Sequence, residues 1–201
     1  MTRTLKIFSV LLFLFAGIRD VSAQMRVDVM GGWAVPSGLD YDKAVKFGLG
    51  YSLDVTYAPG LLDGMLSFGL AKDGNVMFCA GVNIGEKKAS VKASLLGLTG
   101  VKARFDYKNS TSAAKPFGAL TIGVGRLKYG YSEADYDGID QSGVQGDIEL
   151  NYETAYGFGV KPEIGVAFGW FQMGIGWIIP VKYGVHKMKA GSILYSIGFH
   201  L

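Results

Sequence analysis

Strict alternation of side chains is the feature that most limits what this chain can fold into. In residues 45–57 every odd position holds valine, phenylalanine, leucine or tyrosine, and every even position holds lysine, glycine, serine, aspartate or threonine. Successive side chains of a β-strand point to opposite faces, so this pattern predicts a strand whose two faces meet different surroundings. The same alternation returns in 171–181 and in 193–201.

Similar segments along the chain predict an all-β fold. A helical period is absent from the sequence after its first residues. We expect eight strands, with ten as the alternative if the region 61–98 divides further. The expected strands are residues 25–35, 45–57, 65–84, 95–107, 116–131, 155–168, 171–181 and 193–201.

Two irregularities are expected within these strands. Residues 72–75 (Lys-Asp-Gly-Asn) predict a turn or bulge in the third segment, which then leads into a loop over 86–92. In the fifth segment the apolar positions change from even numbers to odd numbers near Gly125. A β-bulge at Gly125 would keep Leu127, Tyr129 and Tyr131 on the same face as Leu120, Ile122 and Val124.

The first residues have the features of an export signal. Arg3 and Lys6 precede an apolar stretch over 7–18, and small residues at 21–23 (Val-Ser-Ala) offer a cleavage site. The apolar stretch is shorter than the ~20 residues that span a bilayer as a helix. We therefore predict a signal peptide over 1–23 and a single barrel domain over 24–201.

Composition excludes several classes of function. The formal charge of +3 falls to +1 when the predicted signal peptide leaves, because three cations and one acid go with it (+3 − 3 + 1). This balance gives no basic footprint for nucleic acid. Cys79 is the single cysteine, so an internal disulfide is excluded. Thirty glycines are spread through the strand-like segments, far above the usual share of about 7%.

Eight alternating segments suit a closed antiparallel barrel, which leaves no strand edge unpaired. A soluble ligand-binding barrel would turn the apolar face inward, whereas a transmembrane barrel would turn it toward lipid. Small residues on the second face, and connections that are shorter at one end, favour the transmembrane barrel. Aromatic residues near strand ends also suit membrane interfaces. They are Tyr57, Phe105, Tyr107, Phe168, Trp170, Phe171 and Phe199 at one end, and Trp33, Tyr129, Tyr131, Tyr156 and Tyr183 at the other.

With these features the chain resembles the small outer-membrane β-barrel family, OmpA/OmpX-like in size and often described as porin-family. The matching pieces are the predicted signal peptide, the strand over 116–125, the strand over 159–165 and a last strand with Phe199 near its end. The family's insertion signal usually ends in an aromatic residue, whereas Leu201 is last here. The resemblance implies location in the outer membrane of a Gram-negative cell envelope, with both termini in the periplasm. It also implies contact with outer-membrane lipid and lipopolysaccharide, insertion by the barrel-assembly machinery, and a monomer.

Charged residues on the second face are the first candidate site. If alternation holds, they point into the barrel, where cations and acids can pair with one another and fill the interior. A gated ion path is the alternative, although eight strands leave an interior just wide enough for side chains. These residues are Arg26, Asp28, Lys46, Asp54, Lys102, Arg104, Asp106, Lys161 and Glu163.

The longest predicted loop, 132–153, is acidic and contains no lysine or arginine. We interpret it as a solvated outer loop, with weak divalent-cation binding as the alternative; its spacing is not that of an EF-hand. Its acids are Glu133, Asp135, Asp137, Asp140, Asp147, Glu149 and Glu153. A second outer loop, 182–189, is basic and contains Lys182, His186, Lys187 and Lys189, which could pair with the acidic loop or contact lipid phosphates.

No residue pattern predicts catalysis, a metal site or a cofactor. His186, Ser192 and Glu153 could meet near the outer rim, but their spacing matches no catalytic motif. The expected function is that of an integral outer-membrane barrel, a non-enzymatic scaffold that presents extracellular loops. A narrow channel for ions or small solutes is the alternative, and a soluble periplasmic ligand-binding barrel is the third possibility.

Overall fold

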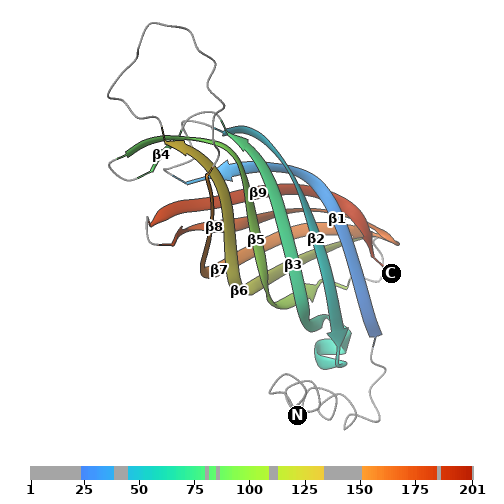
Figure 1. Cartoon of the computed structure of the whole chain (residues 1–201). Coiled ribbons are helices and arrows are strands. Elements are labelled where there is room, and N and C mark those ends of the chain that lie inside the picture. Colours follow the sequence, from blue (N-terminus) through green and yellow to red (C-terminus); the bar gives the residue numbers. More distant parts are fainter. Residues whose placement is uncertain are drawn as a thin grey trace, which may run out of the picture.

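The computed structural model describes residues 24–38, 45–79, 82–84, 87–108, 113–133, 151–184 and 187–200. The predicted signal peptide, 1–23, lies outside these residues, and so does most of the predicted acidic loop. Nearly all the described residues are in β-strands (Figure 1). No helix among them is long and apolar enough to cross a membrane.

Eight long antiparallel strands close into a barrel, as the sequence predicted. In chain order each strand pairs with the next, β3 pairs with β5 past a short β4, and β1 pairs with β9 to complete the ring. A short 3-10 helix, η1 (Leu61–Gly64), joins β2 to β3. The strands are β1 (Gln24–Ser37), β2 (Val45–Ala58), β3 (Leu66–Cys79), β4 (Val82–Ile84), β5 (Lys87–Asp106), β6 (Ala114–Glu133), β7 (Asn151–Phe168), β8 (Phe171–Tyr183) and β9 (Met188–His200).

Apolar side chains face outward and polar side chains face inward, the reverse of a soluble barrel. On β2, Tyr51 and Leu53 are more than 40% exposed, whereas Ser52 and Asp54 between them are at most 1% exposed. The same alternation runs along the other long strands. A band of exposed apolar side chains around a polar interior defines a transmembrane barrel, and it excludes the soluble ligand-binding alternative.

The predicted turn at 72–75 and the predicted loop over 86–92 are both wrong. β3 pairs with β2 and with β5 in unbroken register through Lys72, Asp73 and Gly74, and β5 already begins at Lys87. The polar residues looked like a turn, but Asp73 and Asn75 point into the lumen, where Lys161 and Ser192 bind them. A polar side chain with a buried partner does not interrupt a strand.

The predicted bulge near Gly125 is also wrong. β6 pairs with β7 in unbroken register from Ala114 to Tyr131, so even positions keep facing outward along the whole strand. Leu127 and Tyr129 are therefore buried inside the barrel, while Arg126 and Lys128 are exposed outside. The apolar pattern changes face because the barrel interior itself becomes apolar at this level.

The phase change that does occur lies in β8. The register of β8 against β9 shifts between Ile178 and Val181, on either side of Pro180, which has no N–H to give to a ladder. After this irregularity Tyr183 points inward and is 1% exposed. Tyr129 and Tyr183 therefore do not belong to the outer aromatic girdle.

Other predicted girdle residues do face outward. Trp33 and Tyr156 are more than 60% exposed at one end of the barrel. At the other end Phe105, Tyr107, Phe168, Trp170 and Phe199 are exposed, while Tyr57 and Phe171 are half-buried. Trp170 stacks on Phe199 with 5.1 Å between ring centroids, and Phe171 meets Phe199 edge-on at 6.3 Å. Rings at both ends fit the headgroup levels of a bilayer.

Candidate functional site in the barrel lumen

The two ends of the barrel differ in the chain segments that they carry. The terminal end is where β1 begins and β9 ends, and the loop end is where residues 134–150 join β6 to β7. Figure 1 shows the start of β1 and the end of β9 at the same end of the barrel. The lumen has different contents toward each end.

A buried ion-pair cluster occupies the middle of the lumen. Lys102 Nζ donates to Asp54 Oδ2 and, at 3.0 Å, to Glu163 Oε2. Lys161 Nζ lies 3.1 Å from the same Glu163 oxygen and donates to Asp73 Oδ1 at 2.5 Å. All these side chains are at most 2% exposed. Because β2, β3, β5 and β7 each contribute a member, the cluster ties opposite walls of the barrel together.

A second cluster lies closer to the terminal end. Arg26 Nε donates to Asp28 at 2.8 Å and Arg26 Nη1 to Asp106 at 3.2 Å. Arg104 lies 2.9 Å from Asp106 and 3.3 Å from Asp28. Gln172 Oε1 accepts from both guanidinium groups, at 3.1 Å and 3.0 Å, and its amide donates to Asp28 at 3.0 Å.

Packing and opposite charges hold these clusters together. The Arg104 guanidinium lies 3.6 Å from the centre of the Phe117 ring, a cation–π contact at the lumen wall. Four cations, from Arg26, Lys102, Arg104 and Lys161, meet five acids, so the charge of the two clusters sums to −1 (4 − 5). Buried charges of both signs at hydrogen-bond distance offset much of one another's desolvation cost.

The structure brings together most of the charged residues that the sequence singled out. The side chain of Lys46 lies outside the described part of the chain. Asp73 and Gln172 belong to the clusters but were not among the predicted residues. Asp73 was assigned to the predicted turn, although its odd number in an unbroken strand places it inward. Gln172 is at an inward-facing position of β8, but the prediction considered charged residues only, and its amide is neutral.

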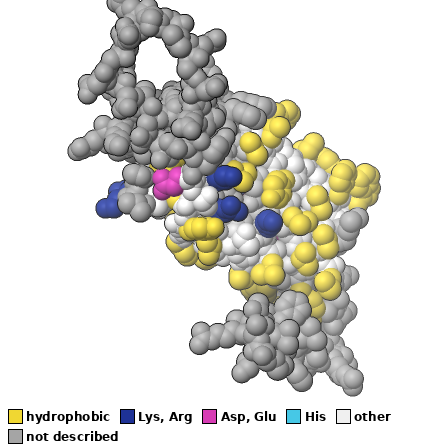
Figure 2. All heavy atoms as spheres, in the orientation of Figure 1, with side chains coloured by type: hydrophobic (Ala, Val, Ile, Leu, Met, Phe, Trp, Pro, Cys, Tyr) yellow, Lys and Arg dark blue, Asp and Glu magenta, His cyan; other side chains and the backbone are white. Residues whose placement is uncertain are grey.

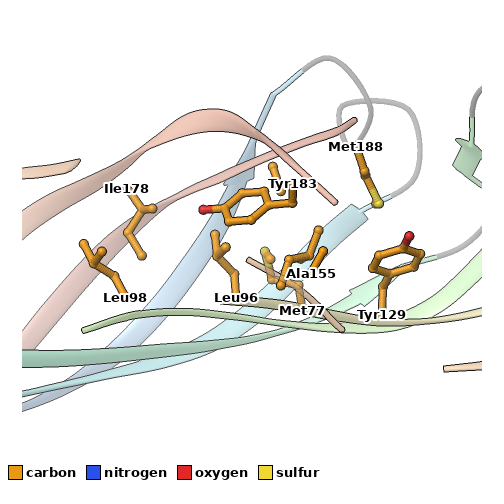
Figure 3. Close-up of a cluster of buried hydrophobic side chains, with 10 residues drawn as sticks. Met77, Leu96, Leu98, Tyr129, Ala155, Ile178, Tyr183 and Met188 are labelled. Atoms are coloured by element: carbon orange, nitrogen blue, oxygen red, sulfur yellow. The ribbon is translucent and has the colours of Figure 1, made fainter. Parts of the chain in front are cut away.

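The lumen near the loop end is apolar instead of charged. Buried side chains from six strands meet there (Figure 3). We call this cluster the apolar plug. Its members are Met77, Leu96, Leu98, Leu127, Tyr129, Ala155, Ile178, Tyr183, Met188 and Ala190, each at most 4% exposed. In Figure 3 the Tyr183 ring of β8 lies next to Leu96 of β5, so side chains from strands that are not neighbours meet in the lumen.

The sequence did not predict the plug, because Leu127, Tyr129 and Tyr183 were expected on the outer face of the barrel. The Tyr129 hydroxyl, which would be costly to bury alone, donates to Glu153 Oε2 at 2.6 Å at the edge of the plug. The unbroken phase of β6 could have revealed Leu127 and Tyr129. Tyr183 faces inward because the register of β8 shifts near Pro180. The proline is the one sequence feature that could have indicated this shift.

The two charged loops are shorter than predicted. Glu133 ends β6 and Glu153 lies inside β7, while Asp135, Asp137, Asp140, Asp147 and Glu149 lie outside the described residues. Lys182 is an exposed residue of β8, Lys189 belongs to β9, and Lys187 is in the turn between them. Strand pairing extends further toward the loop end than the polar composition indicated.

Catalytic geometry is not present among the described residues. Ser192, which was weighed as a nucleophile, is fully buried and accepts a hydrogen bond from Asn75 Nδ2 at 2.5 Å. Within the described ranges no group of three or more His, Cys, Asp or Glu side chains is placed to hold a metal ion. The lumen chemistry is therefore that of ion pairing and packing.

A closed eight-stranded antiparallel barrel with an apolar exterior and an ion-paired interior is the fold of the small outer-membrane β-barrels. Comparison with solved structures gives the same class. Neisserial surface protein A is 15% identical over 90% of this chain and 98% of its own, with a TM-score of 0.50. Two structures of Ail, the attachment invasion locus protein of Yersinia pestis, are 12% and 13% identical over 89% of this chain and 97% of theirs, with TM-scores of 0.44 and 0.42.

At this level of identity the similarity defines the fold. No protein-family model matches the chain, and no curated protein matches its sequence.

Proposed function

We propose that this protein is a closed-lumen scaffold of the outer membrane, which holds its surface loops in place and carries no solute. The observation behind this proposal is the apolar plug. An ion that entered the lumen from the loop end would have to leave water and pass through a layer of buried leucine, methionine and tyrosine side chains. Burial of an unpaired ion in such surroundings is strongly unfavourable.

The ion-pair clusters support the same proposal from the other end. A hollow of about 350 Å³ opens at the terminal end, lined by Arg26, Asp106, Lys115 and His200 among others. It leads toward the two clusters, whose side chains cross the lumen and bind one another. The hollow therefore lies on the terminal side of the ion-pair clusters, and the apolar plug lies beyond them toward the loop end.

Conductance in a planar bilayer tests the proposal against the narrow-channel alternative. Folded barrel, identified by its heat-modifiable migration on a gel, is expected to give no single-channel steps. A general porin in the same bilayer serves as the positive control, and the same preparation after heat denaturation serves as the negative control. Reproducible steps of one size, present only with the folded protein, would overturn the closed-lumen proposal and favour the channel.

A further inference from the structure

The hollow at the terminal end of the barrel differs in charge from the outer wall. Figure 2 shows the outer wall as mainly hydrophobic, with a few basic side chains on the face that it draws. The hollow, of about 350 Å³, is lined by three cations, Arg26, Lys108 and Lys115. Among the described residues that line it, Asp106 is the single acid. With His200 neutral, this lining carries a charge of +2 (3 − 1). We call this site the terminal hollow.

Asp106 does not neutralise the two lysines of the terminal hollow, because it is already bound to two guanidinium groups. Arg26 Nη1 donates to Asp106 at 3.2 Å, and Arg104 Nη2 lies 2.9 Å from it. On the lumen side Asp28 accepts from Arg26 Nε at 2.8 Å and lies 3.3 Å from Arg104. Two arginines and two aspartates therefore balance one another, and the charge of the two lysines is left over.

Hydrogen-bond donors that have no protein partner face the terminal hollow. A guanidinium group has five N–H donors, and Arg26 uses three of them on lumen partners, so two remain. Lys108 Nζ donates to the backbone carbonyl of Asp63 at 2.6 Å and keeps two further N–H donors. The exposed Asp63 is not among the described lining residues. Lys115 is exposed and has no ion pair or hydrogen bond to any described residue.

These donors reach the terminal hollow from different parts of the ring. Arg26 is on β1, Lys115 is on β6, and Lys108 follows β5, where its Nζ would lie 3.0 Å from a Cβ on Gly64 of η1. The Arg26 side chain is 19% exposed, whereas both lysines are exposed at the rim. His200 of β9 also lines the hollow, and its Nδ1 has no hydrogen-bond partner among the described residues. An anion in the hollow would therefore be surrounded by donors.

We propose that the terminal hollow binds a small dicarboxylate. One carboxylate would accept the remaining N–H donors of Arg26, and the other would lie between Lys108 and Lys115 at the rim. Two negative charges match the charge of the lining, and the short apolar body of the ligand would contact Met25 and Ala58. The volume is at the lower end of the roughly 300–1,000 Å³ that small-molecule sites have. Because the ligand enters and leaves by one end, the site does not depend on whether the lumen conducts.

Calorimetric titration of the folded barrel, purified from outer membranes in a nonionic detergent, tests the site. The probes are succinate, its uncharged diamide, acetate and inorganic phosphate. We expect one succinate to bind per barrel, the diamide to give no binding heat, and acetate and phosphate to bind about tenfold more weakly than succinate. Lys108→Gln/Lys115→Gln is expected to weaken succinate binding by about tenfold, since each lysine contributes one solvated ion pair.

Matched variants separate a site from general attraction. Lys72→Gln/Lys182→Gln removes the same charge from exposed positions of the outer wall and is expected to bind succinate like wild type. Lys108→Arg/Lys115→Arg keeps both charges and is expected to retain most of the binding, which guards against a loss caused by misfolding. Ala58→Trp changes no charge but would fill part of the hollow, so it is expected to weaken binding as well. Heat-modifiable migration on a gel identifies the folded barrel of each variant.

Three outcomes would overturn the site: no binding of succinate by the wild-type barrel, equal losses in the two Gln variants, or undiminished binding by Lys108→Gln/Lys115→Gln. Binding of acetate or phosphate as tight as that of succinate would overturn the assignment to a dicarboxylate. None of these results bears on conductance, so the closed-lumen proposal and this site can fail separately.

Discussion

Lys102 illustrates how single residues hold the lumen together. Its ammonium group is fully buried, and it lies between the carboxylates of Asp54 and Glu163. A buried ion pair adds little stability relative to well-packed apolar side chains, because both charges lose their hydration. Removal of one partner is different, since it leaves the other charge buried and uncompensated, at a cost of roughly 3–5 kcal/mol.

We predict that Lys102→Met lowers the free energy of unfolding by about 3–5 kcal/mol. The measurement is urea-induced unfolding of the barrel in lipid vesicles or detergent, followed by tryptophan fluorescence and gel mobility. Lys115→Met, which removes an exposed cation, is the control and should change the free energy by less than about 0.5 kcal/mol. Addition of Asp54→Asn to Lys102→Met should recover part of the loss. Equal stability of the two single variants would contradict the buried-pair interpretation.

At the scale of the strand, β6 shows why glycine is so frequent in this chain. Gly123 faces inward, and a Cβ there would lie 2.1 Å from the Thr99 carbonyl oxygen and 2.4 Å from the Gly100 Cα. Gly118 faces outward on the same strand, and a Cβ there would have nothing within 4 Å. Gly123 therefore lets the backbones of β5 and β6 approach closely, whereas Gly118 borders open space outside the barrel.

Two alanine substitutions in β6 should therefore differ. Gly123→Ala is expected to destabilise the barrel by about 1–3 kcal/mol, because backbone atoms of β5 would have to move. Gly118→Ala is expected to stay within about 0.5 kcal/mol of wild type. Urea midpoints of the two refolded variants, compared at equal protein and lipid concentrations, provide the measurement. A larger loss for Gly118→Ala would show that the close approach of β5 and β6 is not the reason for glycine at position 123.

The alternation of each strand could be predicted from the sequence, but its phase could not be predicted throughout. Alternation correctly placed Asp28, Asp54, Lys102 and Glu163 on the inner face. Around these residues the strands alternate without interruption, and the interior is polar. The prediction failed in β6 and β8, where the interior changes from ionic to apolar. A leucine at an inward position of an apolar lumen has the same composition as a leucine facing lipid, so periodicity alone cannot separate them.

For the whole molecule, the orientation in the membrane follows from the connections between strands. At the terminal end these are residues 59–65, 107–113 and 169–170, and at the loop end they are 38–44, 80–86, 134–150 and 184–187. The expected difference in length thus rests mainly on 134–150. Outer-membrane barrels have short periplasmic turns and longer extracellular loops, which predicts that the loop end lies outside the cell.

Labelling of single cysteines in a Cys79→Ser background tests this orientation. Lys187→Cys lies in a loop-end turn and is expected to react with a membrane-impermeant maleimide on intact cells. Asp63→Cys lies in η1 at the terminal end and is expected to react only after the outer membrane is permeabilised. The reverse pattern would show that the barrel is inserted the other way.

By itself the sequence determined the class of fold, the number of long strands and the side of the barrel that faces lipid. These properties follow from a period of two, which each strand carries locally and which survives small errors in strand ends. Tertiary structure decided what fills the lumen. The pairing of Lys161 with Asp73 and the packing of Tyr183 in the plug both depend on the register between strands. Register is set by closure of the whole ring, and no single strand encodes it.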